Sequence, residues 1–403
     1  MSLEHRTDPL AEARELAAER RWEQAATRFE EAGELLLLAG ADHEARAALA
    51  AAGDAAWRAD QPRLALRCFV RARELATHDA PSRRVRGLQM AAVFLDLGEF
   101  DSAALVLEEA TGGARAPELD LVRLDAQIGL ELVRARIGRA HALLEELGQA
   151  AGPLGSPVHL FRSGQIAARR GEFDVAVEAL STCAGLIGER VAYQGPFGAT
   201  LQELAEVAIL RGDIEDGLAL LDRASSAWER AGRRAGLARV AAARARVLAD
   251  HGVNPHGAET LAPWIAFADQ RGLRVLEAEL RYALGASLLA QEPAQGSAHL
   301  ALAAALAERI GAVGLRGLAL LAQHDRPGGD LDALEQACGD LVELLPWRSR
   351  AFLALAQRLD ERREQHERAL ELCATALCRL SSMDLPRDEA RARGLLWRMS
   401  AGI

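Results

Sequence analysis

Small and large apolar residues recur along this chain at a fixed spacing. An Ala is followed four residues later by Phe or Leu, and three residues after that by a further small or apolar residue, most plainly in GEFDVAVEALSTCAGL at 171–186 and GEFDSAALVLEEATGG at 98–113. Positions i, i+4 and i+7 lie on one face of an α-helix, so each occurrence predicts a helix with one apolar stripe. The clearest occurrences start at Ala25, Ala65, Ala103, Ala140, Ala176 and Gly217.

Successive occurrences start 36 to 41 residues apart, with weaker copies near Ala258 and Ala298. A second apolar stripe precedes the occurrences, as at 201–208. Gly212 follows that stripe, where a glycine can take the left-handed backbone that ends a helix, and Asp213 can cap the next helix. The repeating unit is therefore helix, short turn, helix, and recurrence at this period predicts a solenoid.

The residue sizes within a unit suit close helix packing. Gly164 and Ala176 fall where the two helices of one unit would cross, and a larger side chain there would overpack. Phe173 and Leu180 are large enough to fill the space between neighbouring units. One unit cannot bury its apolar face alone, so the stack of units forms the core.

These patterns predict an all-α protein, an α-solenoid of antiparallel helix pairs. About eight pairs are expected over residues 8–310. Residues 311–403 are expected to hold degenerate repeats and capping helices that continue the solenoid, the last helix spanning about 386–399. A polar terminal helix is what a solenoid needs to close its exposed end.

Composition removes several function classes. The chain contains no Lys, so its 48 basic residues are all Arg, and its one Asn is Asn254, in a predicted loop. Codon bias in a GC-rich genome accounts for such usage. Without Lys there can be no phosphate-binding loop of the Walker type, no kinase ATP-lysine and no Schiff base. The net charge of −10 argues against a nucleic-acid surface.

No catalytic or metal-binding motif stands out. His251 and His256 bracket GVNP but lack a third ligand. The cysteines form no C-x-x-C pair and are expected to be buried small residues: Cys68, Cys183, Cys338, Cys373 and Cys378. We therefore expect no enzyme activity, cofactor or metal. The charged first residues and the lack of a long apolar run indicate a cytoplasmic protein without a membrane span.

The motif A-x3-F-x2-A, preceded by Gly and an aromatic residue, resembles the tetratricopeptide repeat (TPR) family in its long-unit form, as in kinesin light chains and bacterial signalling regulators. The resemblance implies a right-handed superhelix whose concave groove is lined by the first helix of each unit. Carried over by position, the groove residues would be Asp54, Trp57, Arg58, Asp96, Phe161, Gln165, Arg169, Gln202 and Glu206.

The resemblance also implies a function. The leading hypothesis is a non-enzymatic scaffold or adaptor that holds a peptide or helix of a partner protein in the groove. The alternative is a regulatory sensor whose groove binds a small ligand or a signalling peptide. An RNA-reading helical repeat is a third possibility, which the net charge opposes.

A separate candidate lies at 186–200, LIGERVAYQGPFGAT, which is expected to be a long loop between units. Two interpretations stay open for its aromatic residues Tyr193 and Phe197. They either fill a gap between adjacent units or form an exposed contact loop.

Overall fold

The computed structural model describes residues 8–77, 79–110, 116–151, 156–188, 190–250, 257–326, 328–362 and 365–401. Within these ranges it has 21 α-helices, one short 3-10 helix and no β-strand, which confirms the all-α fold class. His251, Asn254 and His256 lie outside the described residues.

The helices of the first half are α1 (Pro9–Ala18), α2 (Trp22–Leu38), α3 (Asp42–Arg58), α4 (Pro62–Glu74), α5 (Ala80–Leu97), α6 (Phe100–Glu109), α7 (Pro117–Val133), α8 (Ile137–Ala151), α9 (Pro157–Arg170), α10 (Phe173–Ile187) and, after the 3-10 helix η1 (Val191–Tyr193), α11 (Gln194–Arg211). The remaining helices are α12 (Ile214–Ala231), α13 (Arg234–Asp250), α14 (Gly257–Arg271), α15 (Arg274–Leu288), α16 (Pro293–Ile310), α17 (Val313–His324), α18 (Leu331–Asp340), α19 (Leu345–Arg362), α20 (His366–Ser382) and α21 (Pro386–Ala401).

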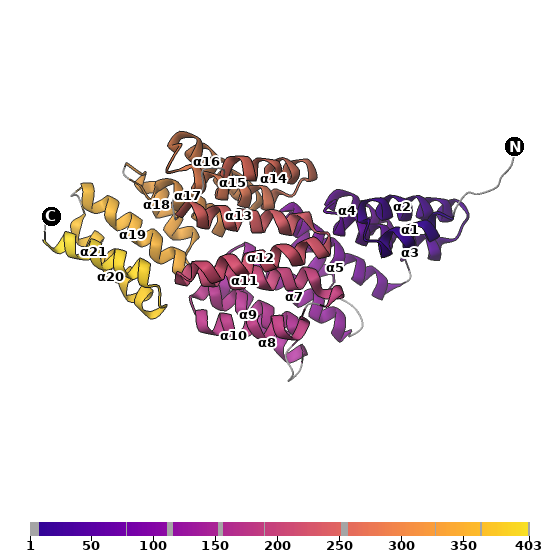
Figure 1. Ribbon diagram of the computed structural model, residues 1–403. Helices are drawn as coiled ribbons and strands as arrows, with labels where there is room; N and C mark the ends of the chain where they lie inside the picture. The colour runs from indigo at the N-terminus through magenta and orange to yellow at the C-terminus, as the bar shows by residue number, and fades with distance from the viewer. Residues whose placement is uncertain are drawn as a thin grey trace.

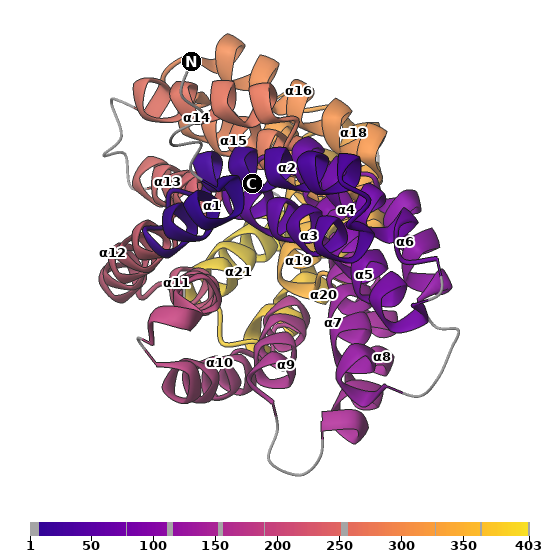
Figure 2. The ribbon, with the colours of Figure 1, turned by 90° about the vertical axis from the view of Figure 1, so that its right-hand side faces the viewer.

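Neighbouring helices in sequence pack against each other, and the antiparallel pairs stack into a superhelix (Figure 1). Figure 2, viewed along the stack, shows the odd-numbered helices α5, α7, α9, α11 and α13 nearer the centre than their even-numbered partners. The first helix of each unit therefore forms the inner wall. None of the helices in the described part of the chain has the length and apolarity needed to cross a membrane.

Small residues sit at the helix crossings, as the sequence predicted. A Cβ atom on Gly164 would lie 2.4 Å from Cγ of Leu180, so only glycine fits there. Leu180 itself is fully buried beside Phe173 and Ala176. Large side chains thus fill the space that small ones leave, and the core runs along the stack.

Most turns between paired helices use a left-handed residue. Gly98, Gly171 and Gly212 end α5, α9 and α11 with φ of 75°, 77° and 97°. The equivalent position after α3 is Asp60, which takes φ of 54° without being glycine. The predicted capping role of Asp213 is only partly realised, because Asp213 occupies the N-cap of α12 but its side chain makes no capping hydrogen bond.

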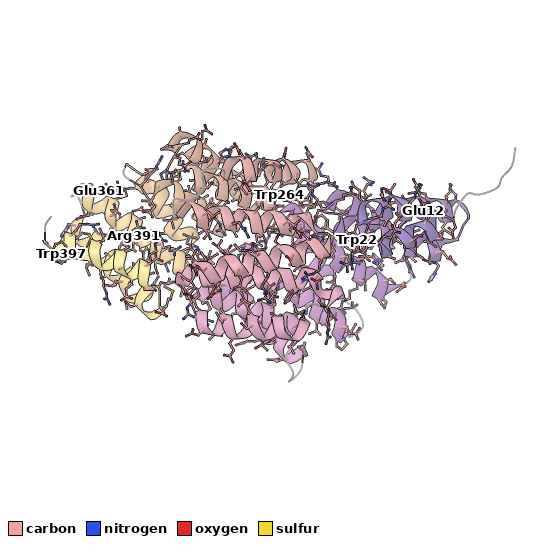
Figure 3. The ribbon with its side chains drawn as sticks, viewed as in Figure 1. Glu12, Trp22, Trp264, Glu361, Arg391 and Trp397 are labelled. Atoms are coloured by element: carbon pink, nitrogen blue, oxygen red, sulfur yellow. The ribbon has the colours of Figure 1, made fainter. Side chains whose placement is uncertain are left out.

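Successive turns of the superhelix touch. Helices ten apart in sequence pack together, namely α5 with α15, α7 with α17 and α9 with α19. At the N-terminal end Asp60 pairs with Arg233 at 2.9 Å, and the Arg20 guanidinium donates to the Arg230 carbonyl. We call this set of contacts between turns the seam. Trp22 lies where α1–α4 meet the next turn (Figure 3).

The prediction of a long loop at 186–200 is wrong. The helix α10 runs to Ile187 and α11 already begins at Gln194. Phe197 is 4% exposed and belongs to the core between α10 and α12, so it cannot present an aromatic surface to a partner. Tyr193, in contrast, is 45% exposed. Burial of Phe197 offsets the poor helix propensity of the Gly and Pro residues around it.

Candidate functional site

Polar side chains of the inner helices pair from one unit to the next. We call these pairs the inner ladder, because the partners stand 34 to 40 residues apart, close to the repeat period. Its pairs are Gln89–Asp54, Trp57–Asp96, Arg162–Asp125, Gln165–Glu203, Arg169–Glu203, Arg246–Glu206 and Arg239–Glu279. The inner wall is therefore charged and hydrogen-bonded rather than apolar.

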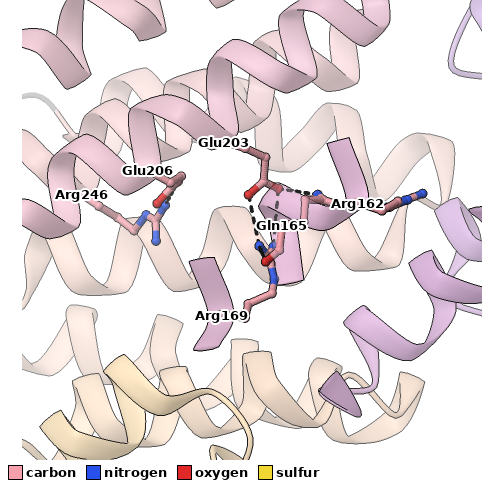
Figure 4. Close-up of polar contacts among 6 residues, drawn as sticks. All are labelled: Arg162, Gln165, Arg169, Glu203, Glu206 and Arg246. Atoms are coloured by element: carbon pink, nitrogen blue, oxygen red, sulfur yellow. Dashed lines mark hydrogen bonds and ion pairs between the residues drawn. The ribbon is translucent and has the colours of Figure 1, made fainter. Parts of the chain in front are cut away.

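Glu203 is the centre of the best connected part of the ladder (Figure 4). Its carboxylate accepts from Gln165 Nε2 at 2.6 Å and from Arg169 Nη1 at 3.1 Å. Arg162 donates to Gln165 Oε1 at 2.8 Å and to Asp125 at 2.6 Å, which links α7, α9 and α11. Burial alone would raise the pKa of Glu203, but the Arg169 guanidinium, the Gln165 hydrogen bond and the charge of Arg162 together outweigh it, and the pKa lies below its ordinary value.

A second pair continues the ladder to α13 and α15. Arg246 donates to Glu206 and also contacts Tyr282, whose ring centre is 5.6 Å from the guanidinium carbon. Burial would lower the pKa of Arg246, yet the Glu206 carboxylate, Tyr282 and Glu279 together raise it above its ordinary value. Both side chains of this pair keep 30% of their surface exposed. The two charges are paired but still partly open to water.

The predicted groove residues on α3 and α5 lie against the seam. Trp57 Nε1 donates to Asp96 at 2.8 Å, and the Arg233 guanidinium stands over the Trp57 ring at 5.2 Å. Arg233 also comes within 3.8 Å of Asp96. Trp57 and Asp96 are therefore contacted by the chain's own next turn. Asp54, half-buried, accepts from Gln89 at 2.7 Å.

The other predicted residues have separate surroundings. Arg58 is exposed and stacks over the Trp22 ring at 4.9 Å. Phe161 packs beside the core of α10–α12, and the guanidinium carbon of Arg162 lies 5.5 Å from the centre of its ring. Gln202 is half-buried on α11. The structure thus brings Gln165 and Arg169 together, and places Glu206 one helical turn from their shared partner.

Two important residues were not found from the sequence. Glu203 stands 38 residues after Gln165, so matching polar residues one repeat apart would have found it. Asp60 gave no such signal, because its partner Arg233 lies 173 residues away on another turn.

We next consider the cysteines and the possible metal ligands among the described residues. Cys68, Cys183, Cys338 and Cys373 are buried, and burial raises the pKa of Cys68 and of Cys338 to about 12. Cys378 is exposed, contrary to the prediction. The described residues contain no group of three or more His, Cys, Asp or Glu side chains placed to hold a metal ion.

No family model matches this chain, and no curated protein matches it. Among solved structures it is similar to a Rap protein complexed with competence and sporulation factor, with a TM-score of 0.50 and 13% identity over 79% of this chain and 98% of that one. Yeast Tom70 matches with a TM-score of 0.31 and 12% identity, over 98% of this chain and 95% of that one. The Rap similarity confirms the TPR-type solenoid fold expected from the sequence.

Proposed function

We propose that this chain is a non-enzymatic binding protein that holds a peptide or helical segment of a partner along its inner wall. The observation that carries the proposal is the water-accessible part of the inner ladder on α9, α11 and α13. There Arg169 keeps 26% and Glu203 19% of the side chain exposed, although both are fixed in position by hydrogen bonds. Side chains held in place lose little entropy when a ligand binds.

The chemistry of these residues suits a peptide. Arginine binds carboxylates through two parallel hydrogen bonds, and the half-buried Gln202 offers an amide that matches a peptide backbone. The Rap protein of similar fold was solved with its factor bound, which supports a peptide ligand. The absence of Lys and the acidic net charge favour a ligand read by Arg and carboxylate pairs over a nucleic acid.

The test uses the whole chain and a phage-displayed library of random peptides. Peptides selected on the wild-type protein are titrated against a variant that combines Arg169→Ala with Glu203→Gln. We expect at least tenfold weaker binding, about 1.4 kcal/mol, because the variant removes an anchoring charge pair from the wall.

The matched control breaks an equivalent pair on the outer helices. Arg67 of α4 and Glu30 of α2 are also one repeat apart and 3.1 Å from each other. The double variant of Arg67→Ala and Glu30→Gln should bind the selected peptides as the wild type does. Equal affinities of all three proteins, with circular dichroism showing all three folded, would refute binding at the inner wall.

A regulatory sensor is the second candidate, and the seam favours it. Arg233 is held by Asp60, Asp96 and Trp57 of the preceding turn. A ligand that competes for these groups would change the contact between turns and shift the population of superhelical states. A thermal-shift screen with metabolites and peptides, followed by small-angle scattering of any hit, tests this. A ligand that stabilises the chain without changing its scattering curve would count against the sensor and leave the scaffold.

A further inference from the structure

Two arginines meet beside one aromatic ring at the corner of α18, α19 and α20. The guanidinium carbon of Arg348 lies 5.1 Å from the centre of the Phe352 ring, and that of Arg379 lies 5.5 Å from it. Arg348 comes from the first turn of α19, and Arg379 comes from the last turn of α20. Two positive charges are thus brought together at one end of the same helix pair.

Neither charge has a carboxylate partner among the described residues. Nη1 of Arg348 donates a hydrogen bond to the Val342 carbonyl at 3.3 Å. Its Nε atom is buried without a hydrogen bond. Nη1 of Arg379 is likewise buried without a hydrogen bond. Such buried unpaired donors are costly in a folded protein.

The neighbouring arginines show what is missing. Arg350 donates to Asp388 at 2.7 Å, and Arg391 of α21 (Figure 3) binds both oxygens of Asp325 at 2.6 and 2.9 Å. The Cys338 thiol near Arg348 cannot serve as a counter-ion, because burial raises its pKa to about 12. Burial and the charge of Arg379 also lower the pKa of Arg348 from its ordinary value.

The arginine pair is distinct from the inner wall. Arg350 donates to Asp388 of α21, 38 residues away, as the pairs of the inner ladder do. Arg348 and Phe352 each lie two residues from Arg350. Two residues correspond to a rotation of about 200° around a helix, so Arg348 and Phe352 lie on the opposite face of α19. The first turn of α19 has no acidic residue, so no carboxylate of that turn competes for the two guanidinium groups.

We propose that Arg348 and Arg379 bind an oxyanion of the phosphate class, either inorganic phosphate or the phosphoryl group of a larger ligand. A phosphate carries close to two negative charges at neutral pH and three or more acceptor oxygens, which matches two cations that have no carboxylate partner among the described residues. A carboxylate would neutralise only one of the two arginines.

The test measures the apparent Tm of the whole chain in phosphate, sulfate, acetate and chloride at equal ionic strength. We expect phosphate to raise the Tm most, because a ligand of the folded state stabilises it. In isothermal titration, phosphate affinity should fall at least tenfold in the variant with Arg348→Gln and Arg379→Gln. Arg391→Gln, which breaks a paired arginine in the same region, should leave phosphate affinity unchanged.

A second measurement uses phosphate-free buffer. Because the two arginines repel each other without an anion, Arg379→Gln should have an apparent Tm equal to or above that of the wild type. Comparing phosphoserine with inorganic phosphate then distinguishes a phosphoryl group on a larger ligand from the free ion. The proposal is overturned by an equal phosphate response in the double variant, by acetate or chloride matching phosphate, or by a lower Tm of Arg379→Gln without phosphate.

Discussion

Replacing Asp60 with Ala should open the seam between the first turn of the superhelix and α13. Asp60 is 2% exposed, and its carboxylate accepts from Arg233 Nε at 2.9 Å and from the Ala235 amide at 3.0 Å. Since α13 begins at Arg234, the second bond caps this helix from 175 residues away. Asp60→Ala removes both the ion pair and the cap.

The expected loss is about 3 kcal/mol of local stability. The loss of a capping acceptor contributes about 1 kcal/mol. Removing one partner of a fully buried ion pair costs about 3–5 kcal/mol. Arg233, however, keeps 20% of its side chain exposed and stays 3.8 Å from Asp96, so the ion-pair cost falls below that range, to about 2 kcal/mol, and the total is about 3 kcal/mol.

Hydrogen–deuterium exchange at the first turn of α13 measures this loss directly. With 1.4 kcal/mol per factor of ten, the amide of Ala235 should exchange about a hundredfold faster in Asp60→Ala. Asp60→Asn keeps an oxygen acceptor and a residue that tolerates the left-handed backbone, so its effect should be smaller.

The control is Asp384→Ala. Asp384 also has a left-handed backbone, with φ of 53°. Its side chain, however, is 80% exposed, and its ion pair with Arg211 is long, at 3.5 Å. Backbone strain from the new Ala is therefore present in both variants and cancels in the comparison. If Asp60→Ala changed exchange at Ala235 by no more than Asp384→Ala does, the seam would not depend on this carboxylate.

Three further predictions follow from single side chains. In urea titrations Gly164→Ala should lower the unfolding free energy by about 1–3 kcal/mol, because the new methyl group would overpack against Leu180. Gly185→Ala, with open space around it, should raise the unfolding free energy by up to about 1 kcal/mol. Equal effects of the two variants would contradict close packing at Gly164. Because its pKa is lowered in the folded state, Glu203 stabilises the fold above its ordinary pKa of 4.5 and loses this contribution as the pH falls through the folded pKa. Glu203→Gln should therefore flatten the acid limb of a curve of Tm against pH. An unchanged acid limb would contradict the pairing of Glu203. Iodoacetamide at pH 8 should label Cys378 alone in the folded chain, and mass spectrometry that finds Cys338 labelled at the same rate would contradict its burial.

Much of the inner wall could be predicted from the repeat alone. Gln165 and Arg169 were placed there by their position in the first helix of a unit, and both face Glu203 of the next unit. This pairing follows from the repeat, because equivalent positions of neighbouring units are stacked side by side. The loop prediction around Phe197 was wrong, because Gly and Pro neighbours indicated a loop, whereas burial of the ring stabilises a helix.

The helical units, their pairing and the small residues at the crossings can be predicted from the sequence alone, because a period of 3.6 residues and the fit of Gly164 against Leu180 are local properties. Which turns of the superhelix touch depends on the folded arrangement of the whole stack. The small rotation from each unit to the next adds up over ten helices, so contacts such as Asp60–Arg233 depend on every crossing between them. The stacking of Arg233 on Trp57 was fixed at that level, where no short stretch of sequence carries the information.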